Sequence, residues 1–200
     1  RCVVELGFSG RPEIHDALPY LRLIPNRHSD PSFERCVNVP PRGIGARTAT
    51  AIREHARASD TSMWAAAVEL ASKTQIPTRA RTSLNYFIDL IEALDASTRD
   101  LDLTEQTDIV VQRSGLIDHY RKQHGEKAQT RVENLEELVS AARHFNYDPA
   151  DDQHPDPLSE FLAHAALEAG EGQAEEWEDC VQLMSLHSAK GLEFPLVFLC

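Results

Sequence analysis

Residues 181–200 read VQLMSLHSAKGLEFPLVFLC, and their pattern differs from that of the rest of the chain. Residues 181–186 alternate loosely between apolar and polar, and residues 195–200 form a continuous apolar run. Both are predicted to be strands, and the second is typical of a buried parallel strand. Since buried parallel strands belong to α/β sheets, this stretch is expected to lie in a different structural unit from the residues before it.

The chain upstream of residue 181 has apolar residues at helical spacing. Helices are expected over residues 13–24, 30–37, 47–57, 62–70, 78–94, 102–111, 117–123, 130–145 and 158–167. Asp30 is the expected N-cap of the second helix, and Pro19 is expected to kink the first. Residues 3–10 read as a short strand that enters a turn. The predicted fold class is therefore mainly α, with short strands at both ends.

Composition excludes several classes of protein. Hydrophobic residues make up 42% of the chain, which predicts a packed globular fold. No apolar run approaches the roughly 20 residues that a membrane span needs, and the first residues lack a signal-peptide pattern. The four cysteines form no CxxC pair and the nine histidines no HExxH motif, so no metal site or disulfide framework is predicted. A reduced, cytoplasmic setting is expected.

Charge is distributed unevenly along the chain. The net charge is −12, but residues 148–179 alone hold eleven Asp or Glu and no Lys or Arg, so the remainder is nearly neutral. Between residues 35 and 57, five arginines oppose a single acid, Glu54. DNA contact is therefore possible at this local patch, although scattered arginines on a solvated helix would give the same pattern.

Within that patch, residues 38–48 read NVPPRGIGART. A Gly-x-Gly turn that enters a helix resembles the hairpin of helix-hairpin-helix DNA-binding motifs. The glycines allow close approach, and the amides at a helix N-terminus can bind a phosphate. The alternative interpretation is an ordinary turn.

The most specific resemblance lies at residues 181–194, which are similar to motif V (T-x-H-x-x-K-G-L-E-F) of superfamily 1 helicases. The matching residues are His187, Lys190, Gly191, Leu192, Glu193 and Phe194, and Ser185 stands where Thr is usual. The resemblance implies that Ser185 and His187 contact single-stranded DNA. It also implies that Gly191 and Glu193 contact the nucleotide, with the carboxylate accepting from the ribose hydroxyl.

Three other stretches are similar to the UvrD/Rep/PcrA type of these helicases. Residues 38–48 resemble P-x-R-G-I-G-x-R-T of its 2B subdomain, which implies a duplex-DNA contact. The implied DNA-binding residues there are Arg42, Gly43, Ile44, Gly45, Arg47 and Thr48. Residues 11–18 resemble R-x-E-I-K-D-A-L, with His15 in place of Lys, and residues 131–138 match R-x-E-N-L-E-E-L.

The resemblance implies a domain organisation and an activity. Residues 1–10 and 179–200 would belong to a RecA-like α/β motor domain (2A), and residues 11–178 to a helical 2B subdomain with a helix-hairpin-helix-like GIG turn. The implied enzyme unwinds DNA in the 3′ to 5′ direction with ATP and Mg²⁺. Its expected partners are single-stranded DNA, duplex DNA and DNA repair proteins. The chain has no P-loop or Mg²⁺-binding acidic motif, so alone it is expected to be inactive and to bind no cofactor.

Two alternatives remain open. One is the helicase subunit of a recombination helicase–nuclease, which a nuclease domain in the full-length protein would identify. The other is a non-catalytic helical module that binds DNA or a repair protein. A charged site at residues 131–137 is a weaker candidate, because the spacing is typical of a structural ion-pair helix.

Overall fold

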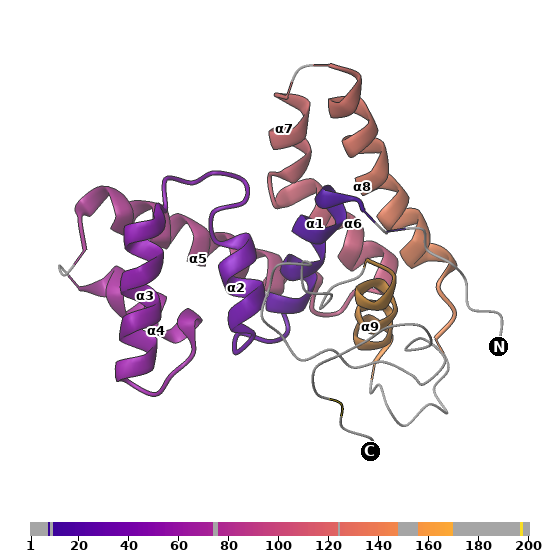
Figure 1. Cartoon of the computed structure of the whole chain (residues 1–200). Helices are drawn as coiled ribbons and strands as arrows, with labels where there is room; N and C mark the ends of the chain where they lie inside the picture. The colour runs from indigo at the N-terminus through magenta and orange to yellow at the C-terminus, as the bar shows by residue number, and fades with distance from the viewer. Residues whose placement is uncertain are drawn as a thin grey trace.

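The computed structural model describes residues 8, 10–73, 76–123, 125–147, 156–169 and 197, and within these residues it forms nine α-helices (Figure 1). The helices are α1 (Pro12–Leu23), α2 (Asp30–Cys36), α3 (Ala46–Ala58), α4 (Met63–Ser72), α5 (Thr78–Thr98), α6 (Leu103–Arg113), α7 (Leu116–Arg121), α8 (Glu126–His144) and α9 (Pro157–Ala169). Each helix expected from the sequence is confirmed, with ends that differ by a few residues. Of the two expected end strands only Phe8, Gly10 and Val197 are described, and none of these three residues is in a strand. The boundary at residues 178/179 lies outside the described residues, and both proposed domain boundaries stay predictions.

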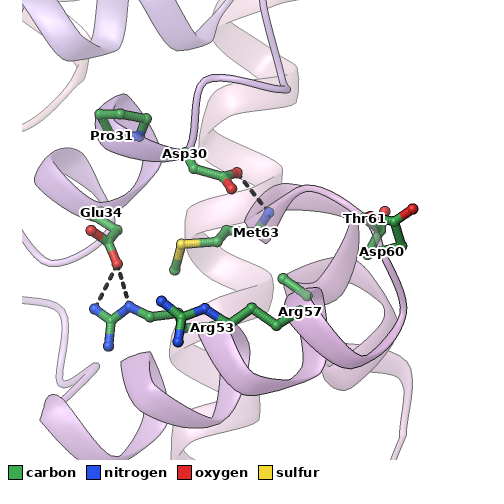
Figure 2. A pocket seen from close by; sticks show the side chains of 9 residues that line it. Asp30, Pro31, Glu34, Arg53, Arg57, Asp60, Thr61 and Met63 are labelled. Carbon is green, nitrogen blue, oxygen red and sulfur yellow. Dashed lines mark hydrogen bonds and ion pairs between the residues drawn. The ribbon is translucent and has the colours of Figure 1, made fainter.

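Local side-chain caps explain where several helices begin. Asp102 and Glu105 form a reciprocal capping box at the start of α6, and Ser62 accepts from the Ala65 amide at the start of α4. The prediction for α2 was wrong in one respect, because Ser29 and not Asp30 is its N-cap residue. The Asp30 carboxylate instead accepts from the Met63 backbone amide at 2.8 Å, which ties α2 to the first turn of α4 (Figure 2).

Helix α1 is the centre of the fold. It packs against α2, α6, α7, α8 and α9, and it continues through Pro19 as one helix. Its apolar residues Ile14, Leu18 and Leu21 are at most 1% exposed, as their helical spacing predicts. Helix α1 therefore contributes to stability through apolar contacts on several of its faces.

Two buried acids of α1 are satisfied by other helices. Asp16 accepts from the Tyr120 hydroxyl of α7 at 2.6 Å and from the Arg35 side chain of α2 at 2.9 Å. Glu13, which is 2% exposed, accepts from the Asn134 side-chain amide of α8 and lies 3.7 Å from Arg131 Nε. The charged face of α8 thus contacts α1, because Arg131 and Asn134 interact with Glu13 of α1.

Helices α3, α4 and α5 lie together on one side of the molecule, with α2 between them and α1 (Figure 1). An aromatic cluster of Phe33, Trp64 and Phe87 joins α2, α4 and α5 through edge-to-face contacts, with ring centroids 5.8–6.5 Å apart. Phe87 of this cluster also lies against the loop between α2 and α3, where its ring centre is 5.4 Å from the Arg42 guanidinium. In Figure 1 that loop arches over α5.

Candidate nucleic-acid interface

The loop between α2 and α3 contains the Gly43-Ile44-Gly45 turn. Asn38 shapes the turn, because its side-chain oxygen accepts from the amides of Arg42 at 2.8 Å and Ile44 at 3.2 Å. Gly43 has φ +82°, a left-handed conformation that favours glycine. Gly45 has an ordinary φ of −81° and is the N-cap residue of α3.

The turn exposes the first amides of α3. Gly43, Gly45, Ala46 and Arg47 are all exposed, and no acceptor for their backbone N–H groups occurs in the part of the chain that the structure describes. No side chain caps α3, whereas Ser62 caps the neighbouring α4. Unpaired amides and the positive end of a helix dipole together form a site for an anion.

Arg42 points into the fold and not toward this surface. Its guanidinium donates to the carbonyl oxygens of Cys36 at 2.9 Å, Pro40 at 3.2 Å and Ser114 at 3.0 Å, and to the Tyr20 hydroxyl at 2.5 Å. It also stacks over the rings of Tyr20 and Phe87. Both terminal nitrogens of the Arg42 guanidinium are therefore engaged within the protein, and its contact with DNA stays a prediction.

Tyr20 completes this internal network. Its hydroxyl accepts from Arg42 and donates to the Val39 carbonyl oxygen, and burial raises the pKa of its phenol. The side chains of Tyr20 and Arg42 thus hold residues 36–42, the part of the loop that precedes the turn. Ile44 adds an apolar anchor, since its side chain is 2% exposed.

The remaining predicted DNA-binding residues of the turn lie at its surface. Arg47 is exposed and Thr48 is half-buried, both in the first turn of α3. Arg47 has no carboxylate partner among the described residues, so its charge is available. The structure therefore brings together Gly43, Gly45, Arg47 and Thr48, but not the Arg42 guanidinium or the Ile44 side chain.

Much of the local positive charge is neutralised elsewhere. Arg35 pairs with Asp16, and Arg53 donates twice to a Glu34 carboxylate oxygen, at 2.6 and 2.8 Å. The second pair borders a cleft between α2, α3 and α4 that Figure 2 shows in close-up. In this mixed-charge cleft Arg53 is paired with Glu34, and Asp30 accepts from the Met63 amide. The cleft is therefore a weaker candidate for an anion site than the turn is.

The residues assigned to motif V are not placed. Ser185, His187, Gly191 and Glu193 lie outside the described residues, and their roles stay predictions. Among the residues that are described, no group of three or more His, Cys, Asp or Glu is arranged to hold a metal ion. None of the described helices combines the length and the hydrophobicity that a membrane span requires.

Sequence reasoning missed three residues that shape the interface: Asn38, Tyr20 and Ser83. Asn38 could have been found, because an Asn that precedes a Gly-containing turn commonly accepts from nearby amides. Tyr20 and Ser83 lie in other helices, and no local pattern marks them as neighbours of the turn. Ser83 Oγ lies 3.4 Å from the position that a Cβ on Gly43 would take.

Comparisons with known proteins identify the family. Residues 1–200 match the family of UvrD-like helicase C-terminal domains. DNA helicase II of Escherichia coli is 54% identical over 194 residues, which are 97% of this chain and 27% of that protein. DNA helicase II of Haemophilus influenzae is 47% identical over 97% of this chain and 26% of its own length. The ATP-dependent DNA helicase PcrA of Bacillus subtilis is 35% identical over 96% of this chain and 26% of its own length.

The chain spans about a quarter of the length of these relatives. The match covers the helical body, the GIG turn and the motif V residues alike. The chain belongs to the family of UvrD-like helicase C-terminal domains.

Proposed function

We propose that this chain is the duplex-binding and motif V part of an ATP-dependent DNA helicase that moves 3′ to 5′ on single-stranded DNA. In this proposal the helical body acts as the 2B subdomain and its GIG turn binds the duplex. Residues 179–200 belong to motor domain 2A, where Gly191 and Glu193 contact ATP and Ser185 and His187 contact single-stranded DNA. The whole enzyme would use ATP and Mg²⁺ and would act with DNA repair proteins. Membership of the family supports the proposal.

One observation carries the proposed DNA contact: the first backbone amides of α3 are exposed and uncapped. They follow a turn that Asn38, Arg42 and Tyr20 fix through hydrogen bonds within the protein. A helix N-terminus carries roughly half a positive charge, and backbone amides bind phosphate without reading the bases. Arg47 adds a full charge in the same first turn. The contact should therefore be insensitive to sequence and weaken as salt rises.

The sharpest test is Gly45→Asp in the full-length protein. Gly45 has φ −81° and an added Cβ would meet nothing within 4 Å, so the fold should accept the substitution. An N-cap aspartate binds the helix amides itself and repels phosphate, while it stabilises the helix by a few tenths of a kcal/mol relative to glycine. Gly43 is a poorer choice, because any side chain at φ +82° is strained.

The expected result is a loss of duplex affinity without a loss of stability. Hydrogen bonds to a charged group contribute about 1.5–3 kcal/mol, which corresponds to about tenfold to a hundredfold in Kd. Fluorescence anisotropy with a labelled, tailed duplex measures that change. ATPase activity stimulated by single-stranded DNA should survive, because the motor domains are unaltered.

The matched control is Ser62→Asp, which adds the same charge at the N-cap of α4. It should leave duplex affinity nearly unchanged. If Gly45→Asp binds duplex DNA as tightly as the unaltered protein does, the turn is only a turn and the proposed contact is wrong.

The two alternatives make different predictions. The helicase–nuclease subunit has no support from the three relatives described above, whose names refer to helicases only. A non-catalytic DNA-binding module would retain the effect of Gly45→Asp but would show no dependence of ATP hydrolysis on Glu193.

A further inference from the structure

Helix α5 lies directly against the GIG turn. A Cβ on Gly43 would lie 3.4 Å from Ser83 Oγ, and the Arg42 guanidinium lies 5.4 Å from the centre of the Phe87 ring. Ser83 and Phe87 are one helical turn apart in α5. The loop therefore rests on the part of α5 around these two residues, as its course over α5 in Figure 1 illustrates.

The same part of α5 carries a stripe of polar residues, which we define as Arg79, Ser83 and Tyr86. Arg79 precedes Ser83 by four positions and Tyr86 follows it by three, so the three side chains share one face of the helix. Arg79 is exposed, and Tyr86 is 63% exposed. The stripe continues the surface of the turn along α5.

The exposure of Tyr86 is unusual for this fold. The other large aromatic side chains of α2, α4 and α5, which are Phe33, Trp64 and Phe87, are at most 8% exposed. In the portion of the chain that is described, Tyr86 makes no ring contact and its hydroxyl has no hydrogen-bond partner. Its ring and hydroxyl are thus available to a ligand.

The first half of α5, which carries the stripe, is also positively charged in an acidic protein. Residues 78–88 contain Arg79 and Arg81 and no acid, although the chain as a whole carries −12. Neither arginine has an ion-pair partner among the described residues, whereas Arg99 at the other end of α5 pairs with Asp95. Unneutralised positive charge beside an anion-binding turn fits a polyanion such as the DNA phosphate backbone.

We infer that the Arg79–Ser83–Tyr86 stripe is a second contact for the phosphate backbone of the duplex that the GIG turn binds, and this inference rests on the proposed function. Arginine, serine and tyrosine side chains are all common donors to DNA phosphates. From Arg79 to Tyr86 the helix rises about 10 Å, which matches the axial rise of about three nucleotides of one strand. These contacts would orient the duplex on α5 and would not depend on its base sequence.

The test compares Arg79, in the first turn of α5, with Arg99, the C-cap residue of the same helix, in the full-length protein. Arg79→Gln should lower duplex affinity about fivefold to tenfold and reduce the slope of log affinity against log salt by about 0.9, the value for one phosphate. Arg99→Gln removes the same charge from a side chain that is 69% exposed, about 30 Å away along α5. It should change neither the affinity nor the slope.

Tyr86→Phe removes only the hydroxyl. It should weaken duplex binding by itself, and combining it with Arg79→Gln should weaken binding further. ATPase activity stimulated by single-stranded DNA should stay unchanged in both variants. If Arg79→Gln and Tyr86→Phe together leave duplex affinity and salt slope unchanged while Gly45→Asp lowers them, the stripe is not a contact and the proposed function stands. If Gly45→Asp has no effect either, the proposed duplex contact fails and the inference fails with it.

Discussion

The stability of the loop that carries the GIG turn should depend on Arg42. Replacing Arg42 with Met keeps a long apolar stem but removes every donor of the guanidinium. The carbonyl oxygens of Cys36, Pro40 and Ser114 then lose a charged partner, and the Tyr20 hydroxyl loses a donor. Ser114 joins α6 to α7, so the substitution also removes the hydrogen bond between the loop and the α6–α7 junction.

The magnitude follows from the geometry. The bonds to Cys36 at 2.9 Å and Ser114 at 3.0 Å are the best-formed contacts to carbonyl oxygens, and each hydrogen bond to a charged group contributes about 1.5 kcal/mol or more. The Pro40 bond is longer at 3.2 Å and adds less. Arg42→Met should therefore lower the free energy of unfolding by about 3 kcal/mol, which corresponds to a fall in Tm of about 6–12 °C for a chain of this size.

Unfolding of the 200-residue chain in guanidinium chloride, followed by circular dichroism at 222 nm, measures the loss. Arg42→Lys should be intermediate, because an ammonium group cannot reach the same set of acceptors as a planar guanidinium. Arg99→Met is the control, since its exposed pair with Asp95 is worth at most about 0.5 kcal/mol. A loss of less than about 1 kcal/mol in Arg42→Met, comparable with the control, would refute the reasoning.

Two further predictions concern a buried thiol and the proposed nucleotide contact. Burial raises the pKa of Cys36 to about 12, so at pH 8 its thiol should stay protonated and resist Ellman's reagent until denaturant is added. A variant in which Cys2, Cys180 and Cys200 are replaced by Ser measures this thiol alone, and rapid labelling under native conditions would contradict the assignment. In the full-length protein, Glu193→Ala should raise the KM for ATP while duplex affinity is retained. Unchanged ATP dependence of unwinding would remove Glu193 from the nucleotide site.

The helices were predictable because their signals are local. Apolar spacing placed Ile14, Leu18 and Leu21 on a buried face, and the helix expected from residue 102 begins directly after Asp102, which is its N-cap. The Gly-x-Gly turn was also visible, because glycine at a positive φ and a helix that follows it involve neighbouring residues only. The prediction for Asp30 failed because the Met63 amide, 33 residues away, competes for its carboxylate.

The sequence by itself therefore determined the mainly helical class, the position of the turn and the family to which the chain belongs. Only the tertiary structure decided how the charges of the turn are used. Arg42 and Arg47 are five positions apart, yet Arg42 donates to acceptors as far away as Ser114, while Arg47 stays exposed. Their difference arises because a guanidinium is held inside only where packing brings several acceptors together. No spacing along the chain encodes that convergence, nor the approach of Ser83 to Gly43.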